Sequence, residues 1–227
     1  MRRLLAALPA TLLLAPAAAH GAAVQTDRSC YLSTSNTTVT VSGNGYTPGS
    51  PYTVTLDGTA LTGGGGTMDA GGAMQGAFAP PALAAGETER TFSVAVQQPD
   101  ALGASTNFTV TRFNAGFSPA KGDPAKLKVR FAVSGFGLGT ANPDVYLHYV
   151  APDGKLKQTV RLGRAQGPCG TIERTAKRRL FPFQNPKHGK WQLQFDTSKG
   201  YTHGVSGASP FLFFTVGVSV HAAPAKK

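Results

Sequence analysis

Two cysteines are the residues best able to form a covalent link in this chain. Cys30 and Cys169 are the only cysteines among 227 residues. An exported chain meets oxidising conditions, in which an even number of thiols favours pairing. We therefore predict a Cys30–Cys169 disulfide that fixes two parts of the chain relative to one another. Closing a loop over a sequence separation of 139 residues would stabilise the fold by about 5 kcal/mol in the chain-entropy treatment. The alternative is two separate thiols.

A second chemistry is suggested by clustered basic residues. The densest run is Arg174, Lys177, Arg178 and Arg179, which Phe181 and Phe183 follow. A further group alternates with apolar residues, namely Lys126, Lys128 and Arg130. Guanidinium and ammonium groups pair with phosphate or other anions, and aromatic rings offer stacking surfaces, so these residues are candidates for binding a polyanion. The alternative is a solvated edge strand on which basic side chains discourage aggregation.

The charge is divided unequally between the two halves of the sequence. Residues 24–113 hold three basic and six acidic residues, a net charge of −3. Residues 114–227 hold seventeen Lys and Arg against five acidic residues, a net charge of +12. Solubility needs much less charge than this, so the asymmetry favours an anionic partner for the second half.

Other reactive residues give no catalytic signature. A Cys–His nucleophile would need Cys169 beside His148, His188 or His203, and it would make the protein a Cys-dependent envelope hydrolase or transpeptidase. The sequence Gly167-Pro168-Cys169-Gly170 lacks the Ser-x-Gly-Cys pattern of such transpeptidases, so this is a remote alternative. The histidines lack metal-ligand spacing and are predicted to lie on the surface. We expect no catalytic residue, no metal site and no cofactor.

The elements that position these residues are predicted to be β-strands. Apolar residues alternate with polar ones along the chain, as a sheet with one buried face requires. In the first half the apolar positions are Val39, Val41, Tyr52, Val54, Leu56, Phe92, Val94, Val96, Phe108 and Val110. In the second half they are Leu127, Val129, Phe131, Val133, Val145, Leu147, Tyr149, Leu156, Val160, Leu162, Trp191, Leu193 and Phe195, before a last apolar run over 211–220. Trp191, in the middle of a strand, is a candidate core anchor.

An internal repeat relates the two halves. Val41-Ser42-Gly43-Asn44-Gly45-Tyr46 returns as Val133-Ser134-Gly135-Phe136-Gly137-Leu138, and each copy precedes an Asp-Gly turn, at Asp57-Gly58 and Asp153-Gly154. A period just under a hundred residues is the size of one immunoglobulin-like sandwich. We predict an all-β chain of two tandem immunoglobulin-like β-sandwiches, over residues 24–113 and 114–220, with a tail over 221–227. Gly63–Gly66 is expected to be an inter-strand loop, and Gly116–Pro119 a linker.

The N-terminal residues predict export. Arg2 and Arg3 precede an apolar run over 4–15, and small residues then offer a cleavage site near His20 or Val24. We assign residues 1–23 to a signal peptide. The apolar run over 211–220 is too short to span a membrane, which takes about 20 residues. The mature protein is therefore expected to be secreted, and not to span the membrane.

Two stretches also resemble known secreted proteins. Thr38-Val39-Thr40-Val41-Ser42-Gly43-Asn44-Gly45-Tyr46-Thr47-Pro48-Gly49 resembles the strand-and-turn motif of secreted actinobacterial immunoglobulin-like domains, and a similar stretch occurs in enediyne-carrying apoproteins of the neocarzinostatin type. Tyr146-Leu147-His148-Tyr149-Val150, Gly167-Pro168-Cys169-Gly170 and Phe181-Pro182-Phe183 resemble a domain of uncharacterised secreted proteins from the same bacteria. The resemblance implies an exported immunoglobulin-like architecture and no mechanism.

These features together favour a non-enzymatic binding or structural module of the cell envelope. The expected partner is an anionic envelope polymer that the basic second sandwich contacts. The alternative partner is another envelope protein, with the chain acting as an adhesion or scaffold module through its sheet edges and loops.

Overall fold

The chain is all-β in the residues that the structure describes. The computed structural model describes residues 21–33, 37–99, 103–138, 141–202 and 214–221, and every regular element in them is a β-strand. The predicted all-β, immunoglobulin-like sandwich class is confirmed. Most of the predicted signal peptide and of the C-terminal tail lies outside the described residues. Within the described ranges no helix occurs that could cross a membrane.

The first sandwich consists of two facing sheets. One sheet has the strand order β1-β3-β6 and contains β1 (Ala23–Thr26), β3 (Val39–Asn44) and β6 (Met74–Phe78). The other has the order β2-β8-β7-β4-β5 and contains β2 (Cys30–Leu32), β8 (Gly103–Thr111), β7 (Glu89–Gln97), β4 (Pro51–Leu56) and β5 (Thr59–Thr67). All pairings are antiparallel except that of β2 with β8.

The core of the first sandwich is built around Phe108. Its ring packs against Tyr31, Phe78 and Phe92 at centroid distances of 5.5, 5.9 and 5.8 Å. The predicted alternation is confirmed here, because Val94 and Val96 are fully buried while Ala95 between them is not. Asp57-Gly58 forms the expected two-residue hairpin turn between β4 and β5, with φ of 48° and 80°.

The second sandwich also consists of two facing sheets. One has the strand order β13-β10-β9 and contains β13 (Arg178–Arg179), β10 (Lys128–Ser134) and β9 (Asn114–Ser118). The other has the order β12-β11-β14-β15 and contains β12 (Leu156–Arg164), β11 (Asp144–Val150), β14 (Gly189–Asp196) and β15 (Phe214–Val220). All of these pairings are antiparallel. The first three residues of the predicted last strand, 211–213, lie outside the described residues.

Trp191 anchors the core of the second sandwich, as predicted. It is 1% exposed, and its ring packs against Phe181 and Phe183 at 5.1 and 5.3 Å. Its indole N–H donates a hydrogen bond to the Lys187 carbonyl at 2.8 Å. This bond satisfies the polar atom of a large buried ring and fixes the turn before β14.

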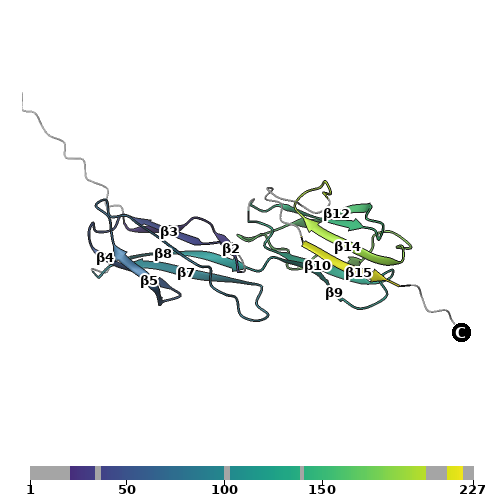
Figure 1. Ribbon diagram of the computed structural model, residues 1–227, viewed down its shortest axis with the longest axis horizontal. Coiled ribbons are helices and arrows are strands. Elements are labelled where there is room, and N and C mark those ends of the chain that lie inside the picture. Colours follow the sequence, from purple (N-terminus) through teal and green to yellow (C-terminus); the bar gives the residue numbers. More distant parts are fainter. Residues whose placement is uncertain (1–20, 34–36, 100–102, 139–140, 203–213, 222–227) are drawn as a thin grey trace, which may run out of the picture.

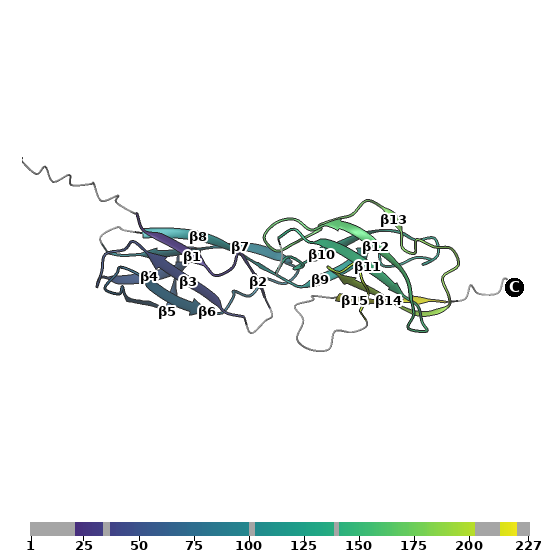
Figure 2. The same ribbon diagram turned by 90° about the horizontal axis from the view of Figure 1, so that it is seen from above.

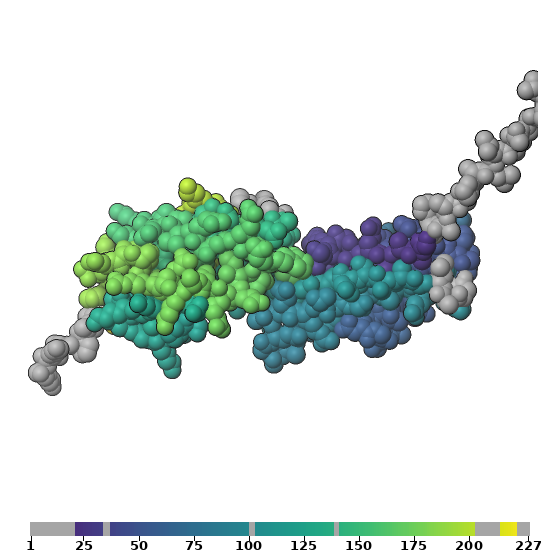
Figure 3. Space-filling view, turned by 180° about the vertical axis from the view of Figure 1, so that it is seen from behind, coloured from purple at the N-terminus to yellow at the C-terminus, as the bar shows by residue number. Residues whose placement is uncertain are grey.

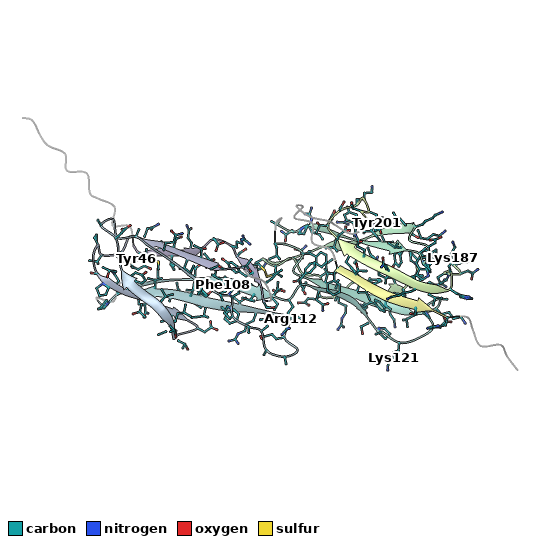
Figure 4. All side chains as sticks on the ribbon, in the orientation of Figure 1. Tyr46, Phe108, Arg112, Lys121, Lys187 and Tyr201 are labelled. Carbon is teal, nitrogen blue, oxygen red and sulfur yellow. A yellow bond between two sulfur atoms is a disulfide. The ribbon has the colours of Figure 1, made fainter. Side chains whose placement is uncertain are left out.

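The two sandwiches lie end to end in an elongated molecule (Figures 1 and 2). Only Arg112 and Phe113 separate β8 from β9, and Figure 4 shows Arg112 between the two lobes. The Arg112 guanidinium donates to the carbonyls of Leu83, Ala84 and Glu87, while its own carbonyl accepts a bond from Ser134 Oγ at 2.7 Å. One residue therefore ties a loop of the first sandwich to a strand of the second.

The expected loop at Gly63–Gly66 is wrong, since these residues belong to β5. They continue the ladder with β4, in which Tyr52 faces Gly66 and Thr53 faces Gly65. A Cβ atom on Gly66 would lie 2.9 Å from the Tyr52 hydroxyl oxygen. The tyrosine ring therefore covers the bare backbone, which explains how a glycine run with little intrinsic strand preference is held in a sheet.

The prediction of a linker at Gly116–Pro119 is also wrong for most of these residues. Residues 114–118 form β9, which pairs with β10 so that Gly116 faces Ala132 and Ser118 faces Arg130. The side chains of Ala115 and Phe117 point inward to the second core, and this burial gives the segment its strand conformation. The segment after the first sandwich is therefore part of the second.

Candidate functional site

Strand pairing brings basic residues from two distant segments together. β10 and β13 pair so that Lys128 faces Arg179 and Val129 faces Arg178. Directly opposed residues of an antiparallel pair project to the same side. Because Val129 is fully buried and Lys128 is exposed, Lys128 and Arg179 share the solvent face. The predicted alternation of basic and buried residues along this strand is confirmed.

Arg130 and Arg174 extend this charged surface. Arg130 lies two residues beyond Lys128 on the same exposed face of β10, and its Nη1 donates to the Thr175 carbonyl at 3.2 Å. Thr175 is fixed in turn, because its N–H donates to the Phe131 carbonyl and its hydroxyl accepts from the Phe131 N–H. Arg174, the residue before Thr175, is exposed, and it lines a surface groove together with Arg130. We call Lys128, Arg130, Arg174 and Arg179 the basic face.

The other three predicted polyanion-binding residues are placed differently. Arg178 faces the same side as Val129, and its charge acts on the buried Tyr149, whose pKa is raised by burial and lowered in part by Arg178. Lys126 is exposed, and its Nζ lies 3.8 Å from Asp123. Lys177 is exposed just before β13. Arg178 is therefore turned away from the basic face and Lys126 has a counter-ion, so the seven residues do not form one surface.

Within the described part of the chain, none of the four cationic groups of the basic face is in contact with a counter-ion. Among the described residues, no carboxylate lies within 4.0 Å of its four cationic groups. By contrast, Arg161 lies 2.7 Å from Asp144, and Lys187 lies 3.1 Å from Asp153. Hydrogen bonds from these cations lower the pKa of Asp144 and of Asp153. The charge of the basic face is thus available to a ligand.

A groove of about 660 Å³ runs beside the basic face. Its floor is the outer side of β9 and β10, including Gly116 and Ala132. Arg130 and the segment from Thr171 to Arg174 line it as well, and Thr88 of the first sandwich closes it. The groove therefore lies at the junction and is built from both sandwiches.

The predicted disulfide is confirmed and lies at this junction. Cys30 and Cys169 are bonded, with their Cα atoms 5.2 Å apart, and their residues are 4% and 0% exposed. The neighbouring Thr171 hydroxyl donates to Glu89 Oε2 of the first sandwich at 2.9 Å. Figure 3 shows the two lobes in contact with one another. The segment that forms one wall of the groove is thereby fixed to the first sandwich.

The disulfide also removes the thiol that the remote Cys-dependent alternative requires. Cys169 Sγ is bonded to Cys30, and no free cysteine occurs in the described residues. Among the described residues, neither His148 nor His188 forms a hydrogen bond with Cys169, and His203 lies outside the described residues. A Cys169 thiolate nucleophile is therefore inconsistent with this structure.

The prediction that the histidines lie on the surface is wrong for His148. It is 0% exposed, although it points to the outer side of its sheet. Its Nδ1 lies 2.8 Å from Thr159 Oγ1, and its Nε2 lies 3.0 Å from Asp196 Oδ1 and 3.1 Å from the Ser198 carbonyl. The segment after β14 folds back over this sheet and places the Tyr201 ring 5.5 Å from the imidazole.

Sequence reasoning missed a second basic region at the far end of the second sandwich. A hollow of about 330 Å³ there is lined by Lys155, Lys157 and Lys187 together with Phe183 and Leu156. Figure 4 shows Lys187 at that end of the molecule. Leu156, at 42% exposure, is the only exposed large hydrophobic residue in the described part of the chain. Lys155 and Lys157 flank the first residue of β12 and Lys187 lies just before β14, so the sequence contains no local basic run that would have indicated this region.

The described residues hold no group of three His, Cys, Asp or Glu side chains arranged to bind a metal ion. The polar cluster of His148, Asp196, Gln194 and Thr159 instead satisfies its hydrogen bonds internally.

Comparison with known proteins finds structures of similar fold but does not assign the chain to a family. No family model matches the chain, and no curated protein sequence matches it. Among solved structures, a tetra-tandem repeat from the extending region of a large adhesion protein is similar over 89% of this chain and 50% of its own, at 13% identity and a TM-score of 0.28. The D0–D1 domain of intimin is similar over 84% of this chain and 96% of its own, at 12% identity and a TM-score of 0.34.

A third similar structure is dimeric latent PorU from Porphyromonas gingivalis, which covers 88% of this chain and 20% of its own, at 14% identity and a TM-score of 0.32. This chain thus spans half or less of the length of the adhesion-protein repeat and of PorU. Likeness at these scores carries no weight for function.

Proposed function

We propose that this protein is a secreted, non-enzymatic binding or structural module of the cell envelope. In this proposal residues 24–113 and 114–220 act as two joined units, and the second unit contacts an anionic envelope polymer through the basic face. The disulfide supports export, because such bonds persist in oxidising compartments outside the cytosol.

The observation that carries the proposal is the convergence of four cations without counter-ions. Lys128 and Arg179 come from segments 51 positions apart in the sequence, yet they are paired across two strands. Like charges opposed across a sheet destabilise it, so the arrangement costs stability in the absence of a ligand. A polyanion would relieve that repulsion and release its own counter-ions on binding.

A second candidate function is protein–protein adhesion through a sheet edge. β5 is an edge strand of nine residues, Thr59–Thr67, and it contains no charged residue and no proline. Edge strands of this kind are templates for pairing with a strand of another chain. This candidate places the partner on the first sandwich, so the two proposals are separable by experiment.

The test uses the full mature chain and a variant that lacks the basic face. Lys128, Arg130, Arg174 and Arg179 are replaced together by Ser, and binding to heparin is measured over a range of salt concentrations. We expect the slope of log affinity against log salt to flatten by about three to four, because each lost ion contact removes about one unit. Exposed charges contribute little to stability, so the variant should stay folded.

The matched control removes the same charge elsewhere. Lys155, Lys157, Lys190 and Lys199 are exposed and lie off the basic face, and their joint replacement by Ser lowers the net charge equally. The control should keep most of the salt slope of the parent. Equal losses in the two variants would mean that only net charge matters, and the basic face would then not be a binding surface.

A further inference from the structure

The groove beside the basic face has chemical features that define a ligand class. It is lined by two guanidinium groups, from Arg130 and Arg174, and by one carboxylate, from Glu173. Hydroxyl and amide side chains line it as well, among them those of Thr88, Asn114 and Ser118, and apolar residues make up much of the rest. A ligand that fits all of these groups must carry negative charge and must also donate hydrogen bonds.

The Glu173 carboxylate makes the groove less favourable for some classes of polyanion than for others. Glu173 would repel the phosphates of a nucleic acid or of polyphosphate, whereas a sugar hydroxyl can donate a hydrogen bond to it. Single-stranded nucleic acids are commonly held by exposed aromatic rings on which bases stack. No aromatic residue in the described part of the chain is exposed, and the Phe117 ring beside the groove packs inward against Phe131 at 6.1 Å.

A glycine lies in the floor of the groove although the fold does not require one there. A Cβ atom on Gly116 would meet no atom within 4 Å, and this residue does not have the positive φ that favours glycine. Neither packing nor backbone conformation therefore requires glycine in the middle of β9, where it costs stability. A glycine in a strand interior can mark a place where a ligand approaches the backbone.

From the charged lining and the open floor together, we infer that the groove binds an anionic polysaccharide with free hydroxyl groups. This inference rests on the proposed function and specifies its ligand. The chain lies across β9 and β10, Arg130 and Arg174 pair with its anionic groups, and Glu173 accepts from its hydroxyls. Thr88 limits the groove at the first sandwich, so the junction that the disulfide fixes forms part of the site.

The test fills the groove without changing charge. Gly116→Leu and Ala132→Leu are made singly in the full chain, with Ser219→Leu, on an exposed position of β15 in the other sheet, as the control. Binding of heparin oligosaccharides, inorganic polyphosphate and single-stranded DNA is compared at one salt concentration, and thermal unfolding checks that each variant is folded. Two independent groove variants keep the test valid if one of them fails to fold.

We expect the groove variants to weaken heparin oligosaccharide binding at least tenfold and to leave polyphosphate binding unchanged, while Ser219→Leu affects neither. Glu173→Gln should strengthen polyphosphate binding. Groove variants that bind the oligosaccharide as the parent does would overturn the inference, and so would tighter binding of polyphosphate or DNA than of the oligosaccharide. If the groove variants bind normally but the variant that lacks the basic face does not bind, the proposed function stands and the inference about the groove fails. If the variant that lacks the basic face also binds normally, the proposed function and the inference both fail.

Discussion

His148 Nε2 lies 3.0 Å from Asp196 Oδ1, and on its other side the imidazole lies 2.8 Å from the Thr159 hydroxyl. Such a hydroxyl–imidazole–carboxylate series occurs in nucleophilic enzymes. Here Asp196 also accepts bonds from the Gln194 amide and the Ser198 N–H, and His148 has no exposed surface. The arrangement therefore serves to attach the segment after β14 to the outer side of the sheet.

We predict that His148→Ala lowers the free energy of unfolding by about 2–4 kcal/mol, because it leaves a cavity and removes a hydrogen-bond partner from a buried carboxylate. Chemical denaturation of the parent and the variant measures this loss. Heparin binding of the folded variant should be unchanged, since His148 is not on the basic face. A stable variant with impaired binding would show instead that the histidine has a direct functional role.

Single residues also show where sequence reasoning reaches its limit. The Cys30–Cys169 bond followed from the count of cysteines and the export signal, and the burial of Trp191 followed from its place in an alternating strand. His148 occupies an outward position in the same kind of pattern, so the pattern assigns it to the surface. Its burial depends on a later segment that folds back over the sheet, and no local sequence feature reports that contact.

At the scale of elements, the alternating strands were predictable and the glycine-rich ones were not. β3, β4, β7, β10, β11 and β14 coincide with runs in which apolar and polar residues alternate. β5 and β9 contain Gly63–Gly66 and Gly116, residues that weaken strands when considered alone. Their conformation comes from tertiary partners, namely the Tyr52 ring over Gly66 and the inward packing of Phe117.

The candidate site shows the same limit. Each basic group was visible in the sequence, and the alternation predicted that Lys128 and Arg130 share an exposed face. The pairing of Lys128 with Arg179 depends on the register between β10 and a two-residue strand, and local sequence does not fix that register. For the same reason the groove, which needs Thr88 from the other sandwich, could not be predicted.

For the whole molecule, the disulfide changes how a pulling force passes through the chain. The two cysteines are 139 positions apart in the sequence, and Cys30 is the first residue of β2. The loop that they close therefore contains the rest of β2 and all strands from β3 to β12, while β1 lies outside it. A force applied near residues 21 and 221 passes through the bridge and bypasses the enclosed strands. Strands β2 to β8 of the first sandwich are thereby protected from mechanical unfolding.

Single-molecule stretching checks this protection. We predict that the Cys30→Ser/Cys169→Ser double variant extends further on full unfolding by about 480 Å, because 139 more residues become available at about 3.5 Å each. A parent chain that reaches the same final length as the variant would contradict the topology.

The central claim is that the basic face is where an anionic polymer binds, and a residue-resolved footprint tests it most directly. The full chain is treated with lysine- and arginine-modifying reagents with and without saturating heparin oligosaccharide, and modification is quantified by mass spectrometry. We expect protection of Lys128, Arg130, Arg174 and Arg179, with Lys155, Lys157, Arg161 and Arg164 labelled equally in both samples. Protection of the second group without the first, or equal labelling of every site, would contradict it.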